Sequence, residues 1–381
     1  MGVRHNFQSA VADGTDATLV RPGDWNANHL VTSFAVGGIT SNAVGQQDNF
    51  SPRGWNDAEP NQATTLYWNG ASSAVISGLA GGFANRLALL VNLGTRLLLL
   101  AHQNSSSLAA NRLDLAFGFN LGFPVVLTQG DAAILMYDAA ASRWRLLSVQ
   151  HTQTSIWRQN YAAMIPGSGT GPVSLGLAHT SQGGTISHPA IIGGSTYKTG
   201  VRKWRGATGT TAGTQSGSRV AYQSLIKNLG FLAQFRWCYD ALPSVNGASF
   251  VGLLNTTTAP GNANPDTFLN MLGFGHRPAD TTLQFLANDG TGAATPVNLG
   301  VNFPINTTAA YNALIYAHPS GLGYSYAIWR LDDATITPAV GDSSADVPAG
   351  STALAHHAWI CNRAVAEDHQ LGIFKLEQFT P

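Results

Sequence analysis

Short apolar runs, separated by turn residues, recur along this chain and restrict what it can fold into more than any other feature. Between residues 51 and 155 there are eight such runs at a spacing of about ten residues, RLALLVNL and AILMYD among them. Short strands at that spacing, with glycine, asparagine and serine between them, are typical of a β-sandwich or barrel. We therefore expect residues 51–155 to form a small middle β-sandwich or barrel.

The run GFLAQFRWCYD carries the clearest strand signal. Phe235 and Trp237 alternate with Gln234 and Arg236, so aromatic and polar side chains fall on opposite faces of one strand. We assign Phe235 and Trp237 to a core. Similar runs, such as SFVGLLN, YNALIYAH and HHAWICN, continue to the C-terminus with turn sequences between them. We expect residues 156–381, which include passages rich in glycine, serine and threonine, to form a second β-sandwich.

The scarcity of charged helix formers supports an all-β chain. Only three glutamates and four lysines occur in 381 residues, and charged residues make up 10%. With 44% hydrophobic residues, so weakly charged a surface would associate unless partner subunits covered it, which favours a homo-oligomer. Basic and acidic residues balance at 20 each, and no apolar run reaches about 18 residues. We expect no nucleic-acid partner and no membrane insertion.

Reactive residue types are present but do not form a recognisable constellation. Cys238 and Cys361 lie in strand-like runs, which predicts buried free thiols. His356 and His357 are adjacent, and neighbouring side chains on a strand point to opposite faces, so the two cannot readily share a metal ion. The carboxylates select no pair with the separation that glycoside hydrolysis requires. We expect no catalytic residue, no metal site and no cofactor.

The segment HNFQSAVADGTDATLVRPGDWNANHLV places a large aromatic residue, Trp25, among turn formers. Tryptophan is enriched at interface hot spots, which favours docking of this segment into a larger assembly. The segment resembles the short N-terminal segment of many bacteriophage virion proteins, tail fibres among them. This resemblance implies that residues 1–50 form an extended arm that anchors the protein to the virion. The matching residues expected to anchor it are Phe7, Val20, Pro22, Trp25, Asn26 and His29.

Two further resemblances cover the rest of the chain. The runs RLALLVNLG, LLLLAHQNSSSLAANRLDL and ILMYDAAASRWRLLS are similar to the β modules of phage fibres and spikes. The runs FVGLLN, LGFGHRP and HHAWICN are similar in pattern to the lectin-like, concanavalin-type jelly rolls that tip such appendages. Together the resemblances imply an arm, a middle β domain and a C-terminal jelly-roll β-sandwich that binds a receptor.

Carbohydrate binding suits the residue types of the C-terminal domain. Sugars are bound by aromatic faces that stack on their C–H surfaces, with amides, carboxylates and arginine as hydrogen-bond partners. A tryptophan in a β-sandwich can instead belong to its core. The candidate carbohydrate-binding residues are Trp204, Arg205, Gln234, Arg236, Asn288, Asp289 and Trp329, and Tyr239 is a further residue of a suitable type.

These features favour a non-enzymatic tail fibre or head spike on the surface of a phage or phage-like gene transfer particle, synthesised in the cytoplasm of a bacterial host. Its arm is expected to contact other virion proteins, and its distal domain to bind bacterial surface polysaccharide for host attachment. Tethering several weak sugar sites raises avidity, so we expect a homo-oligomer, a trimer first and a pentamer at a five-fold vertex. Two alternatives stay open: a purely structural collar, baseplate or head-decoration protein, and a capsule polysaccharide depolymerase.

Overall fold

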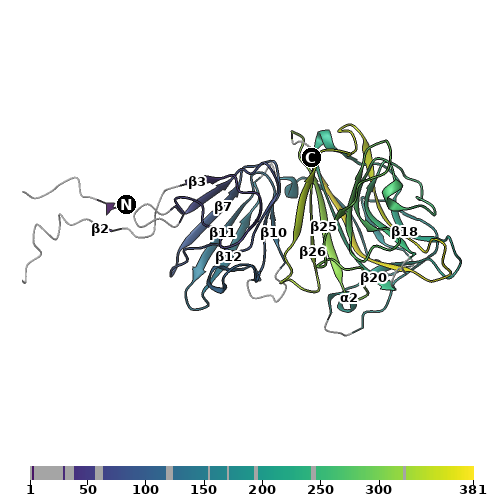
Figure 1. The fold of residues 1–381 in the computed structure, drawn as a ribbon, viewed down its shortest axis with the longest axis horizontal. Coiled ribbons are helices and arrows are strands. Elements are labelled where there is room, and N and C mark those ends of the chain that lie inside the picture. The colour runs from purple at the N-terminus through teal and green to yellow at the C-terminus, as the bar shows by residue number, and fades with distance from the viewer. Residues whose placement is uncertain are drawn as a thin grey trace, which may run out of the picture.

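The computed structural model describes residues 2–3, 29–30, 38–55, 63–116, 123–152, 155–169, 171–192, 196–241, 246–320 and 323–381. β-Strands dominate this part of the chain, and its α-helix, α2 (Tyr197–Gly200), is a single turn. The prediction of an all-β chain is confirmed. Figure 1 shows two β units along the long axis of the molecule, the first in purple and blue and the second in green and yellow. Within the described residues, no helix is both long and apolar enough to cross a membrane.

The first unit, the middle domain, has two sheets around one apolar core. One sheet has the strand order β3-β5-β7-β11-β12-β9, and the other has the order β10-β8-β6-β4. Leu66, Leu98 and Trp144 are among the side chains buried between them. The strands are β3 (Gly38–Ser41), β4 (Gly45–Gln47), β5 (Thr65–Trp68), β6 (Ala74–Ile76), β7 (Leu87–Asn92), β8 (Leu98–Leu100), β9 (Leu113–Asp114), β10 (Val125–Leu127), β11 (Ala132–Asp138) and β12 (Arg143–Gln150).

The first six strands of the middle domain stack as parallel coils. β3, β5 and β7 pair in parallel in one sheet, and β4, β6 and β8 pair in parallel in the other. Thr65 lies beside Leu89 and Ala74 beside Leu98, so the second and third coils are offset by 24 residues in both sheets; the first coil is offset from the second by 27 residues in one sheet (Gly38 beside Thr65) and 29 in the other (Gly45 beside Ala74). The strand spacing in the sequence indicated how many strands to expect but not their direction. A repeat near 24 residues is the signal that indicates stacked coils.

The arm expected at residues 1–50 overlaps the middle domain. β3 and β4 lie inside that range, yet they pair with β5 and β6, and Phe50 is part of the middle-domain core. Residues 38–50 therefore belong to the middle domain, because they complete its first coil. Ahead of them the structure describes β1 (Gly2–Val3) and β2 (His29–Leu30), which pair with each other in antiparallel fashion.

The second unit, the C-terminal domain, has a nine-stranded and an eight-stranded sheet. The first has the order β14-β13-β29-β20-β25-β26-β27 with β16 and β17 attached at β29, and the second has the order β15-β18-β28-β21-β22-β23-β24 with β19 attached at β28. Phe235 and Trp237 are fully buried in the core of this domain, as predicted. The strands are β13 (Asn160–Ile165), β14 (Val173–Leu175), β15 (His179–Ser181), β16 (Thr185–Ser187), β17 (Trp204–Ala207), β18 (Gln215–Val220), β19 (Leu225–Ile226), β20 (Phe231–Ala241), β21 (Ala248–Leu254), β22 (Met271–His276), β23 (Gln284–Asn288), β24 (Val297–Asn298), β25 (Ala310–Ala317), β26 (Tyr324–Arg330), β27 (Ala339–Ser343), β28 (Ala353–Cys361) and β29 (Gln370–Thr380).

The cysteines and paired histidines are structural. Cys238 and Cys361 are buried and unpaired, as the sequence predicted. His356 packs its ring 5.4 Å from that of Phe235, whereas Nε2 of His357 lies 2.8 Å from the carbonyl oxygen of Thr256, so the two histidines do point to opposite faces of β28. Among the described residues, no three histidine, cysteine or acidic side chains come together in a group that could hold a metal ion.

An apolar cluster joins the two domains. Leu99 and Val126, from the four-stranded sheet of the middle domain, pack with Leu314, Tyr316 and Trp329 on the outer face of the nine-stranded sheet. Figure 1 shows β10 of the middle domain next to β25 and β26 of the C-terminal domain. Both faces of the nine-stranded sheet are therefore covered, one by the sandwich core and the other by the middle domain.

Asp342, in β27, provides the polar part of this junction. Its carboxylate accepts hydrogen bonds from the backbone N–H of Ser73 at 2.7 Å and from the Ser73 hydroxyl at 2.9 Å. Arg96 Nη1 lies 3.5 Å from the same carboxylate, and Ser325 Oγ donates to it at 2.5 Å. One half-buried carboxylate thus holds two segments of the middle domain against the C-terminal domain.

We predict that Asp342→Ala loosens the junction between the domains. The substitution leaves the Ser73 and Ser325 donors without their acceptor, at a cost of about 1–3 kcal/mol. Differential scanning calorimetry should show one unfolding transition in the wild type and two separated transitions in the variant. Asp346→Ala is the control, because the Asp346 carboxylate contacts Asp289 within the C-terminal domain. A single, unshifted transition in the Asp342 variant would contradict the prediction.

The buried histidines make stability depend on pH. Burial lowers the pKa of His276, His356 and His357 to about 4, whereas an unfolded imidazole titrates near 6.5. As the pH falls below 6.5, the unfolded chain binds protons that the folded chain does not, so the free energy of unfolding falls until about pH 4. Urea unfolding at pH 7.5, 6 and 5 should show this loss. His357→Gln should reduce the slope, and equal stability at pH 7.5 and 5 would contradict the prediction.

Candidate ligand site between the two domains

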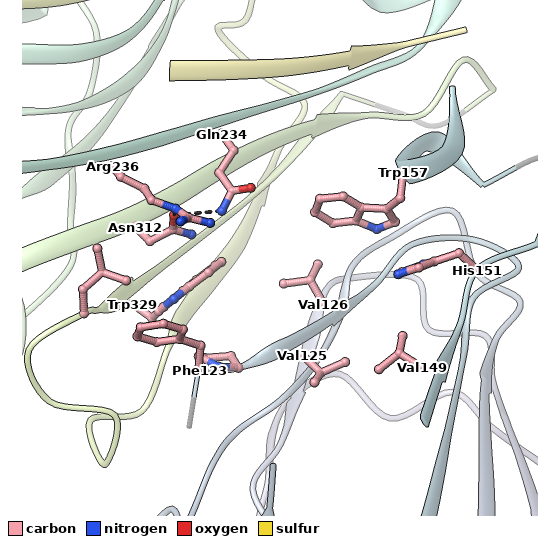
Figure 2. Close-up of a pocket in the computed structure, with 12 residues that line it drawn as sticks. Phe123, Val125, Val126, Val149, His151, Trp157, Gln234, Arg236, Asn312 and Trp329 are labelled. Carbon is pink, nitrogen blue, oxygen red and sulfur yellow. Dashed lines mark hydrogen bonds between the residues drawn. The ribbon is translucent and has the colours of Figure 1, made fainter. Parts of the chain in front are cut away.

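A cavity of about 290 Å³ lies between the domains, at the edge of the apolar cluster that joins them. Strands β20, β25 and β26 supply one wall; β10, β12 and the 3₁₀ turn η2 (Ile156–Arg158) contribute to the other (Figure 2). The residues that line the cavity are Phe123, Pro124, Val125, Val126, Val149, His151, Trp157, Gln234, Arg236, Asn312, Trp329 and Leu331.

Arg236, Asn312 and Trp329 form a row across three adjacent strands. Arg236 of β20 is the register partner of Asn312 in β25, and Asn312 is the register partner of Trp329 in β26. Register partners share one face of a sheet, and this face is opposite to the one that carries Phe235 into the core. Gln234 lies two residues before Arg236 on the same face. The alternation of β20 therefore places both polar side chains in the cavity wall.

Hydrogen bonds fix the orientation of the Asn312 amide. Its Oδ1 accepts from Gln234 Nε2 at 2.8 Å and from Arg236 Nε at 2.7 Å, as the dashed lines in Figure 2 show. Because two donors converge on that oxygen, the nitrogen must point the other way. Asn312 Nδ2 and Trp329 Nε1 are both buried, and neither has a hydrogen-bond partner among the described residues.

The positive charge of Arg236 is only loosely balanced. Its closest carboxylate is that of Glu377, with Nη2 and Oε1 4.0 Å apart. Glu377 also makes a close ion pair with Lys375. Burial acts to lower the pKa of Lys375, but the contacts with Glu377 and Tyr161 outweigh it, so the pKa is raised. Because the Glu377 carboxylate pairs more closely with Lys375 than with Arg236, the terminal N–H groups of Arg236 can still donate hydrogen bonds to a ligand.

The opposite wall is apolar and aromatic. Val126 and Val149 face the cavity from the middle domain, and Phe123 closes it near Trp329 (Figure 2). Trp157 packs edge-on against Phe379 at 5.1 Å, and its Nε1 is a third buried donor without a partner among the described residues. The cavity therefore combines apolar surface with several unpaired N–H groups.

Three of the candidate carbohydrate-binding residues meet in this cavity: Gln234, Arg236 and Trp329. Gln234 and Arg236 lie on one face of β20, as the alternation in the sequence predicted, and Trp329 of β26 lies on the same face of the sheet. Trp329 is 5% exposed, so it forms part of a lined cavity and not of an open aromatic platform. The covering middle domain causes this difference.

The other aromatic candidates belong to the core. Trp204 is fully buried in the C-terminal core, where its Nε1 donates to Ser218 Oγ at 2.8 Å, so it is not available as a sugar platform. Tyr239 is also fully buried, and its hydroxyl lies 2.7 Å from Ser249 Oγ. Trp204 stands beside basic residues and glycines in the sequence, but β17 alternates buried and half-buried positions and Trp204 occupies a buried one.

The remaining candidates lie elsewhere. Asn288 is the last residue of β23, in the eight-stranded sheet, and Asp289 follows it. Asn288 is fully buried and donates to the Phe268 carbonyl oxygen at 2.8 Å. Asp289 accepts from the backbone N–H of Thr291 at 2.7 Å, the pattern of a turn residue. Arg205 points out of β17 and contacts Gln370 at 3.1 Å. None of these three lines the interdomain cavity.

The expected virion-anchoring residues cannot be placed in the same way. Phe7, Val20, Pro22, Trp25 and Asn26 lie outside the described residues. The backbone of His29 is in β2, where it pairs with Val3. Anchoring by these residues therefore stays a prediction from the sequence.

Sequence reasoning missed Asn312, Trp157 and Phe123. Asn312 is the polar residue inside the apolar run YNALIYAH, and a polar residue in such a run could have been recognised as a candidate site residue. Trp157 and Phe123 lie outside the regular strands, and only the tertiary fold brings them to the cavity wall.

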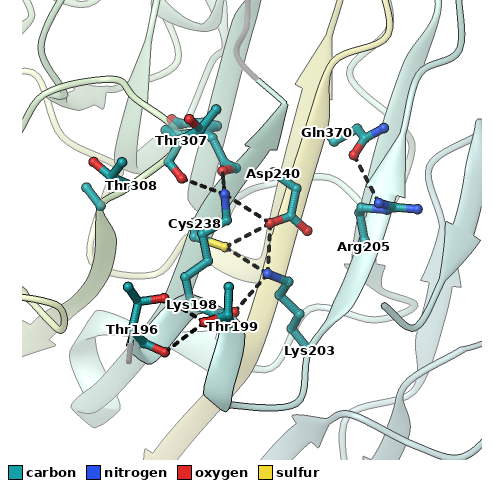
Figure 3. Close-up of polar contacts among 12 residues, drawn as sticks. Thr196, Lys198, Thr199, Lys203, Arg205, Cys238, Asp240, Thr307, Thr308 and Gln370 are labelled. Atoms are coloured by element: carbon teal, nitrogen blue, oxygen red, sulfur yellow. Dashed lines mark hydrogen bonds and ion pairs between the residues drawn. The ribbon is translucent and has the colours of Figure 1, made fainter. Parts of the chain in front are cut away.

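A second cavity, of about 220 Å³, is lined by Lys198, Lys203, Arg205 and Asp240 among others. Lys203 Nζ lies 2.8 Å from Asp240 Oδ1, and Lys198 Nζ donates to the carbonyl oxygens of Tyr239 and Thr307 at 2.7 and 2.6 Å (Figure 3). These bonds engage both ammonium groups within the protein. We therefore interpret this cluster as a structural link between α2 and β20.

Comparisons with known proteins give likenesses of fold only. No family model matches the chain, and no curated protein matches it. A solved protein of unknown function from Shewanella oneidensis MR-1 is similar at 15% identity, over 58% of this chain and 85% of that one, with a TM-score of 0.41. The Emp47p carbohydrate recognition domain has 10% identity, coverage of 57% and 94%, and a TM-score of 0.38. Peanut lectin has 10% identity, coverage of 58% and 97%, and a TM-score of 0.39.

We predict that Asn312→Ala weakens the whole polar row. The variant leaves the Gln234 amide and the Arg236 Nε–H without their shared acceptor, which should cost about 1–3 kcal/mol of stability. Chemical unfolding of the purified protein measures the change. Asn302→Ala, at an exposed position, is the control and should stay within about 0.5 kcal/mol of the wild type. Equal stability of the two variants would show that Asn312 does not organise the site.

Proposed function

We propose that the protein is a non-enzymatic, carbohydrate-binding appendage, and that the cavity between its two domains is the sugar site. The row of Arg236, Asn312 and Trp329, which faces an apolar and aromatic wall, carries this proposal. Its buried, unpaired donors cost stability unless a ligand supplies acceptors. A site of this composition suits a ligand with both C–H faces and oxygen atoms, as sugars have.

The size of the cavity restricts the ligand. Its 290 Å³ is near the lower end of the roughly 300–1,000 Å³ that small-molecule sites occupy. A cavity of this size accommodates a terminal or branch sugar better than a long stretch of polymer. We therefore propose that the protein holds one or two sugar units of a bacterial surface polysaccharide.

Binding without cleavage fits the lining better than hydrolysis does. Glycoside hydrolysis ordinarily uses two carboxyl groups on either side of the scissile bond. None of the described residues that line the cavity is an aspartate or a glutamate. Glu377, the acidic side chain beside Arg236, is 3% exposed and held by Lys375. This arrangement supports binding over the depolymerase alternative.

We further propose that the protein is part of a phage or phage-like particle and attaches it to a bacterial host. Support comes from the resemblance of the N-terminal segment to virion-anchoring arms, and from a surface with few charges. Homo-oligomerisation, as a trimer first, would multiply a weak affinity by about 10²–10⁴ through avidity. The end of the molecule that carries β2 and β3 would then face the particle (Figure 1).

Filling the cavity should abolish binding to polysaccharide. Val149→Trp places a bulky ring in the cavity from β12, whereas Leu147→Trp changes an exposed position on the same strand that does not line it. We expect wild type and Leu147→Trp to bind purified host surface polysaccharide equally, and Val149→Trp to lose at least tenfold in affinity. Isothermal titration calorimetry measures the affinities.

Chromatography of the same samples reports the length of the polysaccharide chains. Unchanged length with saturable binding supports the proposal, and shortened chains would make the protein an enzyme. Equal binding by the two tryptophan variants would place the sugar site elsewhere. No binding by the folded wild-type protein would leave the purely structural alternative.

A further inference from the structure

We propose that the interdomain cavity selects a sugar that carries an anionic group, a carboxylate or a phosphate. This inference rests on the proposed function, because it names the class of sugar that the same site takes. It is drawn from the excess of donors over acceptors in the cavity wall and from the charge of Arg236.

The donors gather on one side of the cavity. Asn312 and Trp329 are 1% and 5% exposed, and Asn312 Nδ2 and Trp329 Nε1 have no partner among the described residues. They are cross-strand neighbours, so they can approach one ligand group together. Arg236, the next member of the row, donates from its Nε to Asn312 Oδ1 at 2.7 Å. The Arg236 side chain is 34% exposed, and its two terminal nitrogens can donate as a pair to one ligand group.

Acceptors are few in this wall. The Asn312 oxygen is already used twice, and the described lining residues include no carboxylate. The Gln234 amide oxygen can accept from one sugar hydroxyl, since the Gln234 nitrogen is the group bonded to Asn312. A neutral sugar presents hydroxyls that need acceptors as well as donors. An anionic group only accepts, so it matches a wall of N–H groups better.

Charge points to the same class of ligand. Arg236 is the permanently charged residue among those that line the cavity, and Glu377 lies 4.0 Å from it while pairing with Lys375. On the far wall His151 Nδ1 lies 3.0 Å from the fully buried Asp131. Asp131 accepts hydrogen bonds from the Thr128 backbone N–H and hydroxyl at 2.9 and 2.7 Å, so that carboxylate is held away from the row. An anion beside Arg236 would complete a charge-assisted, two-pronged hydrogen bond of the kind that guanidinium groups form with carboxylates and phosphates.

The apolar wall accounts for the rest of the ligand. With its anionic group held by the row, a sugar ring would lie against Val126 and Trp157, which come from the middle domain and from η2. Both domains therefore contribute to the site, and neither supplies it alone. A bound ligand should consequently stabilise the junction between the two domains, because it contacts both of them.

Glycan profiling of the full-length protein tests the inference. The probes are immobilised glycans that carry uronic acids, ulosonic acids or sugar phosphates, together with neutral glycans. The strongest acidic binder is then compared with its carboxyl-reduced or dephosphorylated derivative, which separates the two sources of charge. We expect the neutral derivative to bind at least tenfold more weakly, and binding of the acidic form to weaken as salt rises.

Two arginine variants test whether Arg236 is the source of the preference for the acidic glycan. Arg236→Gln should lower affinity for the acidic glycan at least tenfold and for its neutral derivative less than threefold. Arg53→Gln removes the same charge at an exposed position outside the cavity and should change neither value. Thermal unfolding of each variant checks that the fold is intact, and Arg236→Lys should restore part of the affinity.

The outcomes separate this inference from the proposed function. Preference for neutral glycans, with loss of binding on Val149→Trp, would overturn the anionic class and leave sugar binding in place. Equal losses for acidic and neutral glycans in Arg236→Gln would also overturn it, because Arg236 would then only shape the wall. Failure of the folded wild-type protein to bind any glycan would overturn both.

Discussion

The burial of both faces of the nine-stranded sheet is the constraint on which the candidate site depends. One face carries Phe235 and Trp237 into the sandwich core, and the other receives Leu99 and Val126 from the middle domain. A polar residue that lies beneath the middle domain on the second face is no longer at the surface. Asn312 and Trp329, at 1% and 5% exposed, are enclosed for this reason, whereas the Arg236 side chain beside them is 34% exposed. The two buried members of the row must find partners in the wall or in a ligand.

The polar row is unusual because the junction could have been closed with apolar side chains. Leu314 and Ala327, on the same face, do contribute to the apolar cluster. The three-strand row instead leaves Trp329 Nε1 and Asn312 Nδ2 unpaired, while one amide oxygen serves both Gln234 and Arg236. Unpaired buried donors lower stability, so their clustering at a cavity supports the proposal of a ligand site there.

The sequence was sufficient to predict the strands and the wall of the site that carries Gln234 and Arg236. It was not sufficient to predict that the middle domain covers this wall. Alternation in GFLAQFRWCYD separates Gln234 and Arg236 from the core side, because side chains on a strand change face at each residue. The same rule cannot say that the polar side is covered in turn, so Trp329 looked like an open platform. Trp204 was misread because its neighbours in the sequence are basic residues and a glycine. Phe123 and Trp157 reach the cavity only through the packing of two domains, which no local pattern records.

The junction also determines how a bound ligand would act on the molecule. Val126 belongs to the middle domain and Arg236 to the C-terminal domain, and Asp342 fixes the two relative to each other through Ser73 and Arg96. A ligand in the cavity adds contacts to both sides of a junction that is already closed. In the proposed attachment function, separation of the domains would remove one wall of the site and would therefore also release the ligand.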